Sequence, residues 1–264
     1  MRLKITHRTE YSYDGPLYYA LQRLRLVPYS SSSQTVRSWT LAIEGAREEV
    51  RFADHFGNDT RLLSLEGEPH AISVVASGEV ETMDTSGIMG QHRGFAPLWL
   101  FQSETPLTAA GAAVAALAQE IGAGADIERL HQLMQAVRDR VAYDVGATDT
   151  GTTAEAALLQ GSGVCQDHTH IFIAAARRLG FASRYVSGYL MMDHAAEQAA
   201  SHAWAEAHVG GLGWVAFDVA NGISADARYV RVATGRDYRD AMPVSGIRFG
   251  HAEERLAVQI TVEQ

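Results

Sequence analysis

Residues 201–218 read Ser-His-Ala-Trp-Ala-Glu-Ala-His-Val-Gly-Gly-Leu-Gly-Trp-Val-Ala-Phe-Asp. From His202 onward, polar or bulky residues alternate with small apolar ones, which is the two-residue period of a β-strand. His202, Trp204 and Glu206 therefore share one face of this strand, and alanines occupy the other face. The Gly-Gly pair that follows predicts a turn, so the segment is expected to form an antiparallel hairpin.

The register of this hairpin determines which side chains meet. If the loop is centred on Gly210, His202 lies directly opposite Asp218 on the same face. Directly opposed residues have Cβ atoms about 4.5–5.5 Å apart, close enough for an imidazole to donate a hydrogen bond to a carboxylate. A slip of one residue would move Asp218 to the other face. With the Gly210 register, the hairpin predicts a His–Asp pair.

A second motif offers a nucleophile for that pair. Residues 161–168 read Gly-Ser-Gly-Val-Cys-Gln-Asp-His, and Cys165 stands where a helix over 165–179 is expected to begin. The free N–H groups and the positive end of the helix dipole at that place favour a thiolate and could hold an oxyanion. A lone cysteine is more often a small buried apolar residue. Together with His202 and Asp218, however, Cys165 indicates a nucleophile, a base and an orienting group.

The rest of the chain places these motifs in an α+β protein. Short alternating strands between turn residues predict an antiparallel β-sandwich-like domain over residues 1–85. Residues 86–104 are expected to connect it to a core over 105–264, whose final strand could rejoin the β-domain. Helices precede strands in this core, which favours an α+β fold over a doubly wound one. The strands expected are 3–6, 11–13, 22–27, 38–43, 61–65, 71–80, 183–190, 203–209, 214–219 and 256–262, and the helices are 108–121 with Thr108 as its cap, one containing 130–137, 153–159 and 165–179.

The composition and net charge of the chain restrict which classes of function are compatible with the sequence. The 264 residues are 47% hydrophobic and 20% charged, as in ordinary globular proteins. The net charge of −9 opposes binding to nucleic acid phosphates or to an anionic membrane surface. No signal-peptide core and no run of about 18 apolar residues is present. A single cysteine cannot form an intramolecular disulfide, so we expect a cytoplasmic protein with a free thiol.

Two other site chemistries compete with the nucleophile interpretation. Cys165, His168 and His170 have a C-x-x-H-x-H spacing that could suggest zinc. On a helix the two histidines would point about 200° apart, so they could not both face one ion with the cysteine. The sequence contains no G-x-S-x-G serine motif and no nucleotide-binding glycine motif. No metal and no cofactor is therefore expected.

Several motifs resemble those of bacterial transglutaminase-like proteins, in the order cysteine, histidine, aspartate and with matching spacing. This resemblance implies an N-terminal β-domain before a papain-like or transglutaminase-like α+β core. It also implies that Cys165 is the nucleophile, His202 the base and Asp218 the residue that orients the base. The matching segments are 163–167, 184–189, 202–206 and 213–218 in the core, and 7–13 and 54–58 in the β-domain.

The resemblance further implies a cysteine peptidase or amidase that forms a thioester with a peptide, protein or amide substrate. Water as acceptor would complete hydrolysis, whereas an amine would make the protein a protein-glutamine transamidase. Some relatives keep the fold as a binding or scaffold module after losing active-site residues, but this chain has all three.

Supporting positions also match the family pattern. Tyr143, Asp167 and Trp204 stand at recurring core positions, where they either support the structure or contact substrate. Residues 219–221 read Val-Ala-Asn where the family often has Pro-Thr-Asn, and His168 replaces a common aromatic residue.

Overall fold

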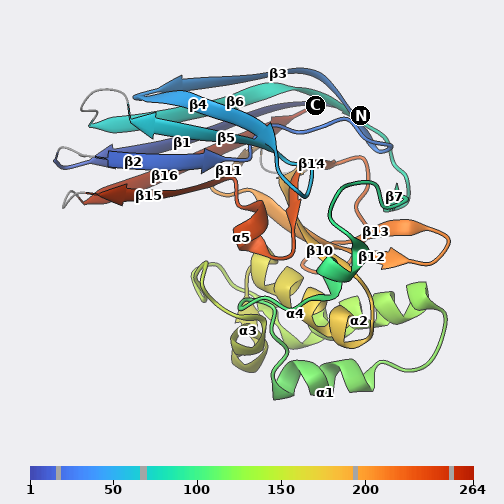
Figure 1. Ribbon diagram of the computed structural model, residues 1–264. Coiled ribbons are helices and arrows are strands. Elements are labelled where there is room, and N and C mark those ends of the chain that lie inside the picture. The colour runs from blue at the N-terminus through green and yellow to red at the C-terminus, as the bar shows by residue number, and fades with distance from the viewer. Residues whose placement is uncertain (16–18, 66–69, 193–195, 250–252) are drawn as a thin grey trace.

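The computed structural model describes residues 1–15, 19–65, 70–192, 196–249 and 253–264. Figure 1 shows a β-sandwich at the top, a core sheet in the middle and helices α1–α4 below. The predicted α+β class, with a β-rich N-terminal part followed by a core of helices and strands, is confirmed. The core sheet has the order β14 (Tyr229–Gly235), β10 (Ser183–Leu190), β12 (His202–Val209), β13 (Gly213–Phe217) and β7 (Ile88–Gly90).

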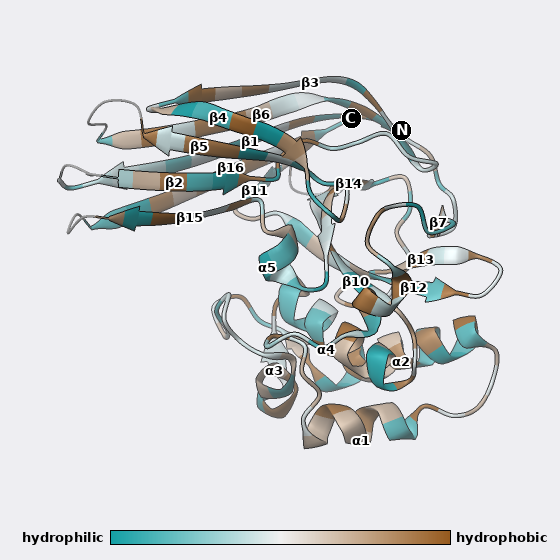
Figure 2. Cartoon of the chain, viewed as in Figure 1, coloured by the Kyte–Doolittle hydropathy of each residue, from teal (hydrophilic) through white to brown (hydrophobic). Residues whose placement is uncertain are grey.

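The sandwich consists of two antiparallel sheets whose facing side chains form an apolar core. Leu24 and Leu63 from one sheet are buried with Ile72, Val74 and Ala76 from the other. In Figure 2, hydrophilic and hydrophobic residues alternate along its strands, as expected where one face is buried. The first sheet is β11 (Glu197–Gln198), β16 (Glu254–Glu263), β1 (Arg2–Tyr13), β6 (Ala71–Thr82) and β3 (Gln34–Glu44), and the second is β15 (Val244–Phe249), β2 (Tyr19–Leu24), β5 (Asp59–Leu65) and β4 (Ala46–Ala53).

The end of the chain contributes to both sheets of the sandwich. Strand β16 pairs with β1 over ten residues of each strand, from Lys4 opposite Glu263 to Tyr13 opposite Glu254. Strand β15 pairs with β2 in the second sheet. The first two strands expected from the sequence, 3–6 and 11–13, form the single strand β1. Strand β4 was not expected because seven of its eight residues are exposed, so it lacks an apolar alternation.

The helices cover the face of the core sheet on which β12 presents its alanines. Ala203, Ala205 and Ala207 of β12 pack in one buried cluster with Phe172 of α4 and with Leu133 of α2. Small side chains on this face let helix α4 approach the sheet closely. The helices are α1 (Ala112–Glu120), α2 (Asp126–Arg140), α3 (Ala154–Gln160), α4 (Cys165–Arg178) and the short α5 (Tyr238–Ala241), and the parallel strands β8 (Ala142–Tyr143) and β9 (Ser162–Gly163) precede the site.

The expected helix cap at Thr108 is wrong. Helix α1 begins beyond it, and the Thr108 hydroxyl instead accepts a hydrogen bond of 2.6 Å from the buried Arg177 guanidinium. The N-terminus of α1 is capped from another helix. The Glu155 carboxylate of α3 accepts hydrogen bonds from the backbone N–H groups of Ala113 and Val114 at 2.7 and 3.0 Å. This contact between distant residues could not be found from local sequence.

Replacing Glu155 tests this tertiary cap. Glu155→Ala leaves two N–H groups of α1 without their acceptor, so we expect the free energy of unfolding to fall by about 1 kcal/mol. Urea unfolding measures the change. Glu10→Ala, which removes an exposed glutamate from β1, is the control and should have a smaller effect. Equal losses in the two variants would contradict the capping role.

Candidate active site

Cys165 is the first residue of helix α4, and its place is fixed by Asp167. The buried Asp167 carboxylate accepts hydrogen bonds from the backbone N–H of Val164 at 2.8 Å and from the Thr148 hydroxyl at 2.6 Å. A Cβ on Gly163 would lie 2.6 Å from Asp167 Oδ2, so only glycine leaves room for this cap. Asp167 thus supports the start of the helix that carries Cys165.

The start of α4 presents backbone donors beside the cysteine. The N–H groups of Asp167 and His168 donate to the carbonyl oxygen of Val164 at 3.0 and 3.1 Å. The N–H groups of Cys165 and Gln166 have no hydrogen-bond acceptor within the described part of the chain. Cys165 itself is half-buried. A negative charge next to its sulfur would therefore meet two free donors and the positive end of the helix dipole.

His202 lies between Cys165 and Asp218. Its Nε2 is 2.6 Å from Asp218 Oδ2, which leaves Nδ1 for the hydrogen bond between His202 and the Cys165 side chain. Only 12% of the His202 side chain is exposed. Burial alone would lower the pKa of His202, but the hydrogen bonds to Asp218 and Cys165 raise it to about 10. The structure thus brings together the three residues proposed from the two sequence motifs.

The β12–β13 hairpin brings His202 to Asp218 with a different register from the Gly210-centred one expected from the sequence. Ala205 lies opposite Phe217, so the loop is centred on Gly211 and not on Gly210. The difference moves each pairing partner by two residues, and a two-residue shift keeps every side chain on its face. His202 therefore meets Asp218 diagonally.

The carboxylate of Asp218 is fully buried and accepts several hydrogen bonds. Its Oδ2 accepts from the Tyr229 hydroxyl at 2.6 Å and from Asn221 Nδ2 at 2.7 Å, in addition to His202. Burial alone would raise the pKa of Asp218, but these hydrogen bonds and the charge of His202 lower it. Tyr229 was not identified from the sequence because it begins β14, a strand without an apolar alternation. From the sequence, Asn221 was noted only as the last residue of the segment 219–221 that resembles the family motif.

Trp204 packs behind the histidine. Its ring is 1% exposed and stacks on His202, with ring centroids 6.2 Å apart and planes inclined by 29°. Trp204 also meets Tyr229 edge to face at 5.3 Å. A Cβ on Gly188 would lie 2.6 Å from the indole, so glycine is required for this close approach. Trp204 therefore holds the orientation of His202 and Tyr229.

Tyr143 borders an open cavity next to the site. The cavity has a volume of about 680 Å³ and is lined by Tyr143, His202 and Asn221 together with apolar side chains. Tyr143 is 58% exposed, and its ring stacks near His168. Burial and the charges of Cys165 and Asp218 raise the pKa of Tyr143. Of the three supporting residues suggested by the sequence, Tyr143 is the one that reaches this space.

The histidines of the zinc hypothesis have other partners. His168 Nδ1 and Nε2 each lie 2.9 Å from a backbone carbonyl oxygen, of Val164 and Val141. His170 Nε2 accepts a hydrogen bond from the backbone N–H of Tyr238. Within the described ranges, no group of three or more histidine, cysteine or carboxylate side chains is arranged to hold a metal ion. The same ranges contain no helix long and apolar enough to cross a membrane.

Comparisons with known proteins match both halves of the chain. Residues 115–219 match the model of the transglutaminase-like superfamily, and residues 3–81 match the bacterial transglutaminase-like N-terminal region. An uncharacterized protein of Mycobacterium leprae is 29% identical over 99% of this chain and 98% of its own length. An uncharacterized protein of Mycobacterium tuberculosis is 26% identical over 99% of this chain and 92% of its own length.

The fold has a counterpart among solved structures. A candidate cysteine protease from Cytophaga hutchinsonii superimposes with a TM-score of 0.78 at 22% sequence identity. The match covers 100% of this chain and 91% of that protein. The sandwich and the core therefore occur together, in the same arrangement, in a second protein.

The raised pKa of His202 gives a pH prediction. Because this pKa lies above the ordinary value of 6.5, the ion pair of protonated His202 with Asp218 is fully formed on this account just below pH 6.5, and its stabilising effect is lost as the pH rises through about 10. NMR of the ring should show titration near pH 10 in the wild type. Cys165→Ala and Asp218→Asn should each lower the pKa, since each removes one partner. A wild-type His202 that titrates near 6.5 would contradict this description.

Proposed function

We propose that this chain, which belongs to the transglutaminase-like superfamily and carries a bacterial transglutaminase-like N-terminal region, is a thiol-dependent acyl-transfer enzyme that hydrolyses a peptide or amide bond. One observation carries the proposal. His202 hydrogen-bonds to Cys165 at the N-terminus of a helix and, through its other ring nitrogen, to the buried carboxylate of Asp218. This is the arrangement of a nucleophile, a general base and an orienting group.

In the proposed reaction, the Cys165 thiolate attacks the carbonyl carbon of the substrate. The oxyanion that forms accepts hydrogen bonds from the free N–H groups of Cys165 and Gln166. His202 starts as an imidazolium and gives its proton to the leaving amine, so that the C–N bond breaks and a thioester remains on Cys165. Asp218 holds the ring in place and stabilises its positive charge.

Water then completes the cycle. Neutral His202 takes a proton from a water molecule, whose oxygen attacks the thioester carbonyl. The carboxylic acid leaves, and the proton returns the Cys165–His202 pair to its starting state. The open cavity beside His202 supports this step because it gives both the acyl group and water access to the ring.

The reactivity of the thiol tests the Cys–His pair. An ordinary cysteine is only about 3% thiolate at pH 7, so a preformed ion pair should react with iodoacetamide about tenfold faster or more. We expect His202→Ala to lose this advantage. His208→Ala is the matched control, because His208 lies on the same face of β12 six residues away and does not contact Cys165. A thiol that reacts equally in both variants would leave a non-catalytic binding module as the better description.

The acceptor is tested separately. With a peptide or activated amide substrate at neutral pH, we expect release of the free acid to exceed transfer to an added primary amine. Mass spectrometry of the products measures the ratio, with Cys165→Ser as the inactive control. Predominant amide formation would indicate a transamidase instead.

A further inference from the structure

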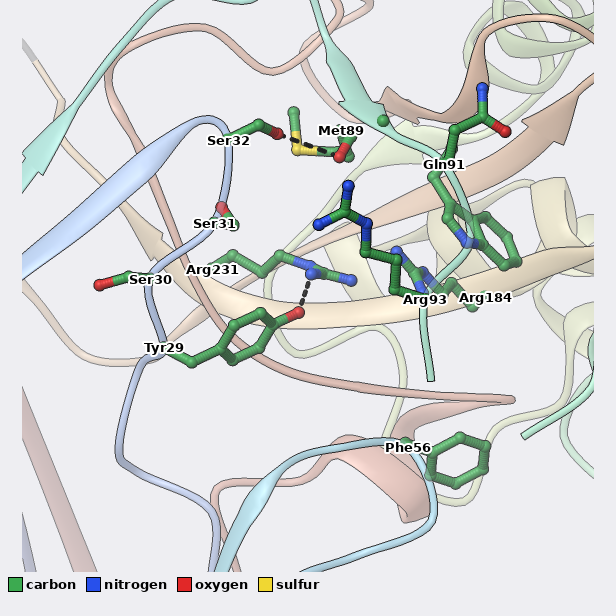
Figure 3. Close-up of a pocket in the computed structure, with 12 residues that line it drawn as sticks. Tyr29, Ser30, Ser31, Ser32, Phe56, Met89, Gln91, Arg93, Arg184 and Arg231 are labelled. Atoms are coloured by element: carbon green, nitrogen blue, oxygen red, sulfur yellow. Dashed lines mark hydrogen bonds between the residues drawn. The ribbon is translucent and has the colours of Figure 1, made fainter. Parts of the chain in front are cut away.

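A second cavity, away from Cys165, is lined by positive charge. It has a volume of about 470 Å³ and lies between the core sheet and loops of the sandwich. Figure 3 shows the side chains of Arg93, Arg184 and Arg231 converging on it from three different segments. Tyr29 and Ser31 come from the loop that links β2 to β3. A volume of this size accommodates a small organic ligand.

The charges around this cavity do not balance. None of the described residues that line it is acidic. Glu206 lies beneath the wall, is fully buried, and accepts hydrogen bonds from Arg184 at 2.7 Å and from Arg231 at 3.1 Å. One carboxylate thus faces two buried guanidinium groups, and the exposed Arg93 adds a further positive charge at the cavity. This excess of positive charge occurs in a chain whose net charge is −9.

A purely structural role accounts for only part of the cluster. Glu206 and Arg184 join neighbouring strands, and Arg184 also stacks 3.9 Å above the ring of Trp214. Arg231 donates a hydrogen bond to the Tyr29 hydroxyl, which carries no compensating charge. Arg93 has no ion-pair partner among the residues that the structure describes. Arg184 and Arg231, in contrast to the exposed Arg93, are buried and share one carboxylate, and a buried charge without a counter-charge is costly, so an anion in the cavity would remove a penalty that the protein alone leaves in place.

We propose that this cavity binds the carboxylate or phosphate group of a small organic anion. Guanidinium groups present paired N–H donors that match both oxyanions, and Ser31 can add a hydroxyl donor. The aromatic rings of Tyr29 and Phe56 line the same space and would contact the organic part of the ligand.

The cavity is distinct from the proposed reaction site. Glu206 follows His202 by four residues on β12, a separation of about 13 Å along a strand. Trp204 lies between them on the same face. The ligand would therefore occupy a site beyond the reach of the Cys165 thiol, and this inference does not depend on the proposed reaction.

Calorimetric titration at low ionic strength tests the site, because surface charges are least screened there. Succinate and citrate probe carboxylate binding, and inorganic phosphate and phenyl phosphate probe phosphate binding. We expect saturable binding of at least one probe with one site per chain, and at least tenfold weaker binding to Arg93→Ala. Arg178→Ala, an exposed arginine that does not line the cavity, removes the same charge and should bind as the wild type does.

A second variant keeps the test informative if Arg93→Ala is ambiguous. Ser31→Asp introduces a fixed carboxylate into the cavity, so we expect it to raise the melting temperature and to weaken anion binding at least tenfold. Cys165 alkylation should be unchanged in both variants, which separates this proposal from the reaction. The absence of binding to all four probes at about 10 mM, or equal binding by wild type, Arg93→Ala and Ser31→Asp, would overturn the proposal.

Discussion

The carboxylate of Asp218 has no exposed surface, so its charge has to be met entirely by donors within the protein. Three side chains meet it, those of His202, Asn221 and Tyr229, and each comes from a different segment. Removing one partner of a buried ion pair costs about 3–5 kcal/mol. The strand β12, the turn after β13 and the start of β14 are therefore held in one arrangement by a single group. The orientation of His202, and with it the contact to Cys165, follows from that requirement.

The two faces of the core sheet have different roles: one packs against the helices, and the other carries polar side chains. The face of β12 toward helix α4 carries Ala203, Ala205 and Ala207, which lets the helix pack closely with its N-terminal Cys165 beside His202 at the start of β12. The other face carries His202, Trp204 and Glu206 in succession along β12. His202 takes part in the Cys165–Asp218 contacts, Glu206 pairs with buried arginines, and the indole of Trp204 keeps the two polar clusters apart. A strict two-residue alternation in one strand thus organises both the proposed reaction site and the proposed anion site.

Much of this arrangement could be predicted from local patterns. The alternation of residues 202–209 and the glycine loop before Cys165 predicted the observed strand and helix, and they named three residues that the structure brings together. The Gly211 register required tertiary information, because a Gly-Gly-Leu-Gly turn permits more than one centre. Tyr229 lies in a strand whose residues are buried on both faces, so no period marks it. The Glu155 cap and the Arg231–Glu206 pair join residues far apart in sequence, and no local signal indicates such contacts.

The proposed reaction requires Cys165 to carry an acyl group during turnover. Intact-mass spectrometry after rapid acid quenching of a reaction with an activated acyl ester tests it most directly. We expect one acyl adduct per chain, assigned to Cys165 by peptide mapping, formed and discharged in the wild type and absent in Cys165→Ser. A wild-type protein that forms no adduct, or an adduct that survives in Cys165→Ser, would contradict it.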